Sequence, residues 1–254
     1  MKKKEGTNML SQIKKSAPLV HCMTNYVVAN FTANGLLAIG ASPIMADEVN
    51  EVSEIVTKAQ ALLINIGTVN ERTAEAMLIA GKKANELSIP IVLDPVGVGA
   101  TSYRKQLVQQ LLREVQFDLI RCNIGELAAI ADEVWQSKGV DSGTGEIDAI
   151  VVAKRVALQY KCLVVVTGET DFVTDGLKEL QVAGGKESAT RITGTGCLLS
   201  AVCAASLASG IHPLQDLART LKDYKHAAEQ SANELGTFAV HFMNALQKIS
   251  EGEN

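Results

Sequence analysis

Short apolar runs alternate with segments of helical spacing through the first two thirds of the chain. The apolar runs predict strands at residues 18–22, 42–46, 61–66, 89–94, 117–122 and 162–167. Apolar residues three or four positions apart predict helices between them, over 26–39, 51–60, 70–87, 107–115, 124–131 and 147–158. Strands and helices that alternate this often form parallel sheets. The pattern therefore predicts an α/β fold, with a mostly parallel central sheet flanked by helices on both faces.

The last third of the chain breaks this alternation. Residues 171–174 and 177–183 flank the dipeptide Asp175-Gly176, which predicts an antiparallel hairpin at the edge of the sheet. Helical spacing then predicts three helices, over 196–209, 214–233 and 237–249. The glycine-rich loop 137–145 is too short to link two domains, so we expect a single domain over residues 1–254.

The composition excludes several classes of protein. A net charge of −4 gives no basic surface for nucleic acid, and 4% aromatic residues are too few to stack bases. The five cysteines show no CxxC spacing, so neither a disulfide framework nor a zinc site is expected. No apolar stretch reaches the ~18 residues of a membrane span, and no apolar signal-peptide region follows the charged start. We therefore expect a cytoplasmic protein that binds neither nucleic acid nor membranes.

Residues 192–201 place two glycines and a threonine at the start of a helix of small residues. The backbone N–H groups of Gly194, Thr195, Gly196 and Cys197 would face one point, where the helix dipole favours negative charge. This predicts an anion cradle, although a tight turn before a buried helix would use the same residues. In the first turn, the thiol of Cys197 is expected to have a lowered pKa, the alternative being a small buried apolar side chain. The remaining cysteines are expected in the core: Cys22, Cys122, Cys162 and Cys203.

Polar side chains follow several predicted strands at the point where each strand ends. Asp94 ends one strand, Arg121 and Glu126 flank the end of the next, and Thr167 ends another. Ligands bind beyond the carboxyl ends of parallel strands, where Arg121 could bind a phosphate and the carboxylates could hold Mg²⁺. An Asp closing a turn and a Glu at a helix start are the alternatives. The P-loop, GxSxG and HExxH motifs do not occur.

Five sequence segments together resemble hydroxyethylthiazole kinase. They read VHCMTNYVV at 20–28, GASPIMA at 40–46, LDPVGVGA at 93–100, NIGE at 123–126 and GTGC at 194–197. The resemblance extends from about residue 18 to the last predicted helix. It implies a ribokinase-like fold and an enzyme that uses ATP and Mg²⁺. That enzyme would phosphorylate the hydroxyl of 4-methyl-5-(2-hydroxyethyl)thiazole, salvaging the thiazole half of thiamine.

The resemblance also implies residues that bind the alcohol substrate. Asn25, Val27 and Met45 would contact the thiazole, and Gly194 would contact the substrate within the anion cradle. The resemblance further implies a homotrimer with thiazole sites at subunit boundaries. In such a trimer Met45 would act on a neighbour's site.

The ATP and magnesium sites follow from the same resemblance. Arg121, Asn123 and Thr167 would bind ATP, while Asp94 and Glu126 would serve the magnesium and phosphate end. The family more often has Arg-Gly-Asn where this chain has Arg121-Cys122-Asn123. We expect that change to be tolerated, because only Arg121 and Asn123 carry a polar role there.

Cys197 stands where most ribokinase-like enzymes have an aspartate. It would sit beside the attacking primary hydroxyl and accept its proton late in the reaction, contributing about 10²-fold to the rate. Two other functions remain open at this stage. One is a hydroxymethylpyrimidine kinase of the same superfamily, which the apolar Val27 and Met45 disfavour. The other is a non-catalytic nucleotide sensor, which would need no base.

Overall fold

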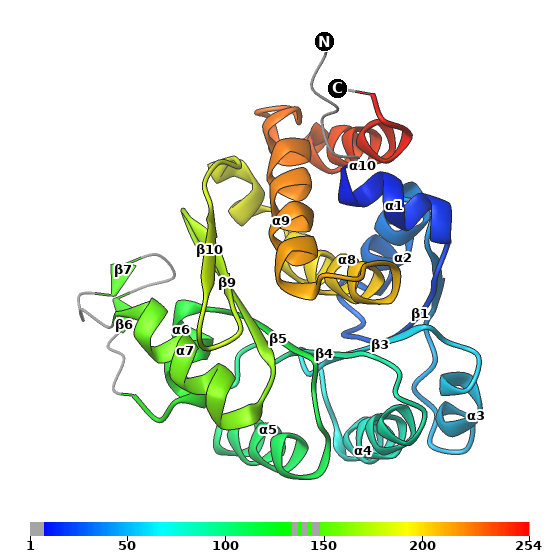
Figure 1. The fold of residues 1–254 in the computed structure, drawn as a ribbon, viewed down its shortest axis with the longest axis vertical. Coiled ribbons are helices and arrows are strands. Elements are labelled where there is room, and N and C mark those ends of the chain that lie inside the picture. Colours follow the sequence, from blue (N-terminus) through cyan, green and yellow to red (C-terminus); the bar gives the residue numbers. More distant parts are fainter. Residues whose placement is uncertain (1–7, 134–136, 139–141, 144–147, 254) are drawn as a thin grey trace.

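The computed structural model describes residues 8–133, 137–138, 142–143 and 148–253. Within them one sheet has eight strands, in the order β10-β9-β8-β5-β4-β3-β1-β2 (Figure 1). Six strands are parallel, whereas β9 runs antiparallel to both β8 and β10. The strands are β1 (Leu19–Met23), β2 (Ser42–Ile44), β3 (Ala61–Asn65), β4 (Ile91–Asp94), β5 (Leu119–Asn123), β8 (Leu163–Thr167), β9 (Asp171–Thr174) and β10 (Glu179–Val182). The predicted parallel sheet and its antiparallel edge hairpin are confirmed.

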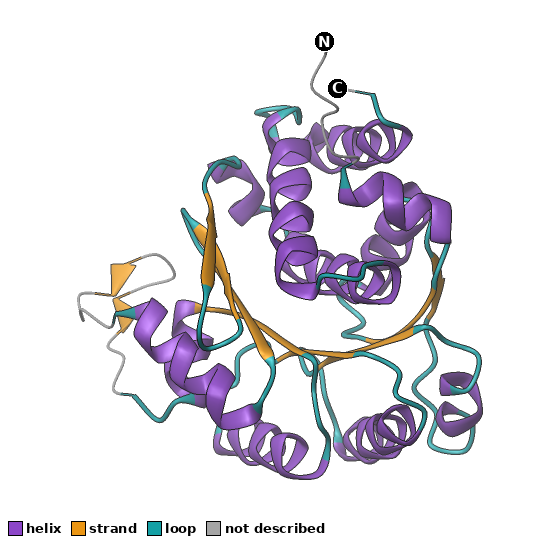
Figure 2. Cartoon of the chain, in the orientation of Figure 1, coloured by secondary structure: helices purple, strands orange, loops and turns teal. Residues whose placement is uncertain are grey.

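Helices cover both faces of the sheet, as also predicted (Figures 1 and 2). One face carries α1 (Met9–Ser16), α2 (Ala29–Ala38), α8 (Thr195–Ser209), α9 (Pro213–Glu229) and α10 (Leu235–Glu251). The other face carries α3 (Val52–Val56), α4 (Glu71–Glu86), α5 (Ser102–Glu114), α6 (Ile124–Ile130) and α7 (Ala149–Tyr160). Each layer buries its own apolar cluster against the sheet. In the part of the chain that the structure describes, no helix is both long and apolar enough to cross a membrane.

Short elements lie outside this scheme. The strands β6 (Ser137–Lys138) and β7 (Ser142–Gly143) form a separate antiparallel pair. The rest of the predicted loop 137–145 lies outside the described residues, as does residue 147 of the predicted helix 147–158. A 3-10 helix, η1 (Glu187–Arg191), lies between β10 and α8, where no element was predicted.

Two predicted helices are shorter than their apolar spacing suggests. The helix predicted from residue 26 begins at Ala29, because the carbonyl of Asn25 accepts a hydrogen bond from the N–H of Val28 (3.3 Å) and closes a turn. The helix predicted over 51–60 is only α3, because the backbone then switches to tighter bonds such as that from the Lys58 N–H to the Ile55 carbonyl (3.0 Å). By contrast, Asn70 caps α4 as predicted, in a capping box with Thr73.

The first helix, α1, has no counterpart among the predicted elements. Its eight residues are too few for a stable isolated helix, so tertiary contacts must hold it. Met9, Leu10 and Ile13 are fully buried, and the carboxylate of Asp223 accepts hydrogen bonds from the N–H groups of Met9 (2.7 Å) and Leu10 (3.2 Å). These partners lie in the last third of the chain, which local spacing cannot reveal.

Helix α8 is the element that positions the site. Its residues from Leu198 to Ser206 are all buried, and it packs over β1, β3 and β4. Gly35 lets α2 approach closely, since a Cβ there would lie 2.3 Å from Leu198 Cδ1. This packing brings the first turn of α8 to the ends of the central strands.

Candidate active site

Asp94 lies fully buried at the end of β4, and its two carboxylate oxygens have different surroundings. Oδ2 accepts hydrogen bonds from Asn65 Nδ2 (2.7 Å) and Ser200 Oγ (2.8 Å). Oδ1 has no hydrogen-bond partner among the described residues, and Arg121 Nη1 lies 3.9 Å from it. Burial raises the pKa of Asp94 to about 7, with Arg121 acting against that rise and Glu126 adding to it. Asp94 is thus a buried carboxylate in which Oδ1, near the guanidinium of Arg121, accepts no hydrogen bond from the described residues.

Arg121 joins three strand ends. It lies on β5 with its side chain 11% exposed, and its Nη2 donates a hydrogen bond to Thr167 Oγ1 (2.6 Å). A Cβ on Gly196 would lie 3.0 Å from Arg121 Nη1, so this glycine lets the guanidinium approach the first turn of α8. The prediction that Asp94, Arg121, Thr167 and the glycine motif gather at one edge therefore agrees with the geometry.

The predicted anion cradle lies at the start of α8. Gly194 is its N-cap with a φ of 103°, a conformation that glycine adopts readily. The next three residues, Thr195, Gly196 and Cys197, form the first turn, where backbone N–H groups have no partner within the helix. Thr195 turns its hydroxyl elsewhere, donating to the carbonyl of Ala189 (2.9 Å). The cradle is therefore built from backbone N–H groups beside the Arg121 side chain.

The thiol of Cys197 does not have the lowered pKa that its place in the helix predicts. Burial raises its pKa to about 11, and the Asp94 carboxylate adds to the rise. These two effects outweigh the hydrogen bonds from Asn65 and from Asn25, whose Nδ2 lies 3.4 Å from Sγ, and the positive charge of Arg121. The expectation of a lowered pKa is wrong. The other cysteines are buried in the core as predicted.

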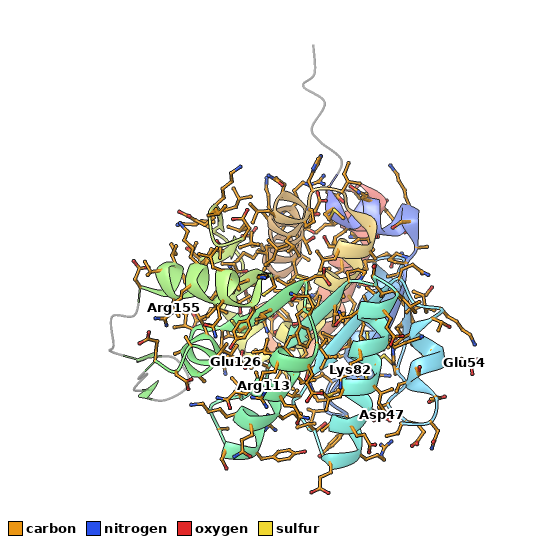
Figure 3. The ribbon with its side chains drawn as sticks, turned by 60° about the horizontal axis from the view of Figure 1, so that its bottom comes forward. Asp47, Glu54, Lys82, Arg113, Glu126 and Arg155 are labelled. Carbon is orange, nitrogen blue, oxygen red and sulfur yellow. The ribbon has the colours of Figure 1, made fainter. Side chains whose placement is uncertain are left out.

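Glu126, labelled in Figure 3, turns back toward the ends of the strands, as the sequence suggests and as its hydrogen bonds show. Its Oε2 accepts from the N–H of Asn123 (2.9 Å) and its Oε1 from the N–H of Gly97 (3.0 Å), in the loop after Asp94. In return Asn123 Oδ1 accepts from the N–H of Glu126 (2.8 Å), which completes a capping box at the start of α6. Both residues thus have a structural role, the alternative considered for Glu126, at the edge where ATP and magnesium are expected.

The predicted thiazole contacts lie after β1 and β2, the neighbouring strands at the other side of the sheet. Asn25 is 5% exposed, and its Nδ2 also donates to Asn65 Oδ1 (3.0 Å). Val27 and Met45 are 61% and 38% exposed. Asn25 therefore joins the cluster around Cys197, while Val27 and Met45 offer accessible apolar surface.

Comparison with known proteins identifies the family. The model of the hydroxyethylthiazole kinase family matches residues 10–252. The chain belongs to that family. It is 56% identical over 245 residues to hydroxyethylthiazole kinase of Lysinibacillus sphaericus, covering 95% of this chain and 96% of the relative.

A solved structure from the hydroxyethylthiazole kinase family agrees with this assignment, and a more distant one shows the same fold. The family's structure from Pyrococcus horikoshii superposes with a TM-score of 0.87 at 38% identity, covering 96% of this chain and 93% of that one. A ribokinase-like superfamily protein from Enterococcus faecalis shares the fold at 11% identity, with a TM-score of 0.69 and coverage of 99% and 90%. The resemblance seen in the sequence and the ribokinase-like fold are confirmed.

Two polar residues at the candidate active site of this hydroxyethylthiazole kinase family member were not among the residues proposed from the sequence. Asn65 links Asp94 to Asn25, and Ser200 supplies the second hydrogen bond to Asp94 Oδ2. Asn65 ends an otherwise apolar strand, the same signal that pointed to Asp94. Ser200 offers no such signal, because one serine in a helix of small residues looks like the others. Among the described residues, no group of three or more His, Cys, Asp or Glu side chains is placed to hold a metal ion.

Proposed function

We propose that this kinase transfers the γ-phosphoryl group of ATP to the hydroxyl of 4-methyl-5-(2-hydroxyethyl)thiazole, in thiazole salvage for thiamine biosynthesis. The observation that carries the proposal is the meeting of Arg121, Asp94 and the first turn of α8 in a chain of this family. Phosphoryl transfer asks a protein mainly for in-line positioning and for neutralisation of the charge on the phosphoryl oxygens. A guanidinium and a set of backbone N–H groups supply both.

ATP would bind across the ends of β5 and β8. Arg121 is already oriented by its hydrogen bond to Thr167 Oγ1, which leaves its other guanidinium N–H groups for phosphate oxygens. Asn123 is exposed and its Oδ1 caps α6, so its side-chain N–H₂ group would be available to ATP. The N–H groups of residues 195–197 would then bind the phosphoryl group in transfer.

Asp94 and Glu126 fit a magnesium ion that arrives with ATP. Carboxylate oxygens are the ligands that Mg²⁺ prefers, and Asp94 Oδ1 is buried with no hydrogen-bond partner among the described residues. The two residues would hold Mg²⁺ largely through water, with phosphate oxygens as the other ligands. When bound, Mg²⁺ neutralises negative charge on the phosphates. Arg121, whose Nη1 lies 3.9 Å from the same Asp94 Oδ1, would share in balancing the charge of that carboxylate.

Cys197 would accept the proton of the attacking hydroxyl. Because its pKa is raised to about 11, the thiolate is a minor species in the unliganded site. Asn65, Asn25 and Arg121 act against this rise by stabilising the thiolate. A base that is rarely ionised gives only modest assistance, which agrees with a contribution of about 10²-fold rather than an absolute requirement.

Exposed apolar residues after β1 and β2 could contact the thiazole and a neighbouring subunit. Tyr26, Val27 and Met45 are 80%, 61% and 38% exposed, although large apolar side chains are usually buried. We propose that the thiazole and a neighbouring subunit of a cytoplasmic homotrimer cover them. Sedimentation of the purified protein at micromolar concentration should give the mass of three chains.

Release of ADP tests the proposed activity. The protein is mixed with ATP, Mg²⁺ and either the thiazole alcohol, the hydroxymethylpyrimidine or no alcohol. We expect ADP only with the thiazole alcohol. Preference for the pyrimidine would show a hydroxymethylpyrimidine kinase, and ATP binding without turnover would show a nucleotide sensor.

A further inference from the structure

One lysine of α9 contacts backbone carbonyl groups of two separate turns. Lys225 is 11% exposed, and its Nζ lies 3.4 Å from the carbonyl oxygen of Gly168, 3.1 Å from that of Glu169 and 3.0 Å from that of Gly184. It also lies 3.3 Å from Oδ1 of Asp171, which is 6% exposed. Gly168 and Glu169 follow β8, whereas Gly184 follows β10. A single, largely covered ammonium group thus joins the turns at the ends of these two strands.

The next turn of α9 completes the contact with the second segment. Glu229 Oε1 accepts a hydrogen bond from the N–H of Gly185 (2.8 Å), four residues along the helix from Lys225. Gly184 and Gly185 have φ values of 105° and 92°, which side chains rarely adopt. The helix therefore binds the carbonyl of one glycine and the N–H of the next, which fixes the start of the connection between β10 and α8.

The far end of the same connection also contacts α9. The hydroxyl of Tyr224, next to Lys225, donates to the carbonyl of Thr195 (2.6 Å) in the first turn of α8. Figure 1 shows α9 lying beside β9 and β10, and these elements pack together. Adjacent residues of one helix thus hold both ends of the segment that leads into the anion cradle.

The two joined segments are continuous with the proposed nucleotide site. Gly168 directly follows Thr167, which accepts the hydrogen bond from Arg121, and the connection that begins at Gly184 ends at the cradle. We propose that Lys225 is a positioning residue for the nucleotide: it holds the turn after β8 and the connection after β10 at the separation that ATP binding requires. This rests on the proposed function only in placing the nucleotide at Thr167 and the cradle. Among the proposed substrate contacts, Gly194 lies at the cradle, whereas Asn25 and Met45 follow β1 and β2, away from the contacts of Lys225.

Four substitutions separate this role from general stability. Lys225→Met keeps most of the aliphatic chain and removes the donors, while Lys225→Arg restores charge and donors. Lys225→Met combined with Asp171→Asn removes both charges, so that no buried carboxylate is left unpaired. Lys222→Met changes an exposed lysine on the same helix and serves as the matched control.

Calorimetric titration with ADP and steady-state kinetics with both substrates test the proposal. We expect Lys225→Met and the double variant to bind ADP about tenfold more weakly, with KM for ATP rising alike. KM for the thiazole alcohol should stay within about twofold, and Lys225→Arg should recover most of the ADP affinity. Lys222→Met should match the unchanged protein.

Three outcomes would overturn the proposal. They are unchanged ADP affinity in Lys225→Met and the double variant, an equal rise in KM for both substrates, and an unchanged protein that binds no ADP. A different result separates the two hypotheses. If the unchanged protein binds ADP and phosphorylates another alcohol, while the Lys225 variants lose ADP affinity, the role of Lys225 stands and the proposed substrate does not.

Discussion

Replacing Asp94 by asparagine should remove a pH-dependent loss of stability, so the stability of the variant relative to the unchanged protein should grow with pH. Burial raises the pKa of Asp94 from 3.8 to about 7, so the folded state favours its protonated form. The stability from this group is complete below pH 3.8 and is lost as the pH rises through about 7. The whole shift corresponds to roughly 4 kcal/mol, at about 1.4 kcal/mol per pKa unit. About 3 kcal/mol of it falls between pH 5 and pH 8.

Urea unfolding at a series of pH values, with a chelator to remove divalent cations, measures this effect. The free energy of unfolding of Asp94→Asn minus that of the unchanged protein should rise by about 3 kcal/mol from pH 5 to pH 8. Asp47→Asn makes the same chemical change on the surface and serves as the control. A difference that stays level across this range would show that Arg121 and the two hydrogen bonds to Oδ2 compensate the buried charge. The reasoning about Asp94 would then be wrong.

Three further substitutions test the site and its scaffold. Cys197→Ala should lower kcat about 10²-fold, while Cys197→Asp should stay active. If the Ala variant is as fast as the unchanged protein and the Asp variant is inactive, Cys197 is not the base. Gly196→Ala places a Cβ 3.0 Å from Arg121 Nη1 and should raise KM for ATP about tenfold or more. Gly236→Ala, with nothing within 4 Å, should leave KM unchanged, and equal effects would refute the close-approach argument. Asn70→Ala removes the capping box of α4 and should lower the free energy of unfolding by about 1 kcal/mol in urea titrations. An unchanged urea midpoint would show that the cap contributes little to stability.

Apolar spacing predicted the sheet because its strands are buried on both faces and read as apolar runs. It could not predict α1, whose helical state depends on Asp223 and on packing against the last helices. Apolar spacing also placed the start of α2 too early and the end of α3 too late, because hydrogen bonds within turns decide those boundaries.

The site was predictable where a polar residue ends an apolar strand, as Asp94 and Thr167 do. Asn65 carries the same signal and was missed, whereas Ser200 and Lys225 carry none. Lys225 lies on an amphipathic helix, where a lysine normally faces water, and only the fold brings three carbonyl groups to it. The pKa of Cys197 was predicted in the wrong direction, because sequence shows the helix start but not the burial and the nearby carboxylate.

The identity of the phosphorylated product tests the central proposal most directly. The protein is incubated with ATP, Mg²⁺ and equal concentrations of the thiazole alcohol and the hydroxymethylpyrimidine, and the products are separated and weighed by mass spectrometry. The proposed function predicts that the phosphate ester of the thiazole alcohol predominates and forms in step with ADP. A predominant pyrimidine phosphate, or bound ATP with no phosphate ester, would contradict it.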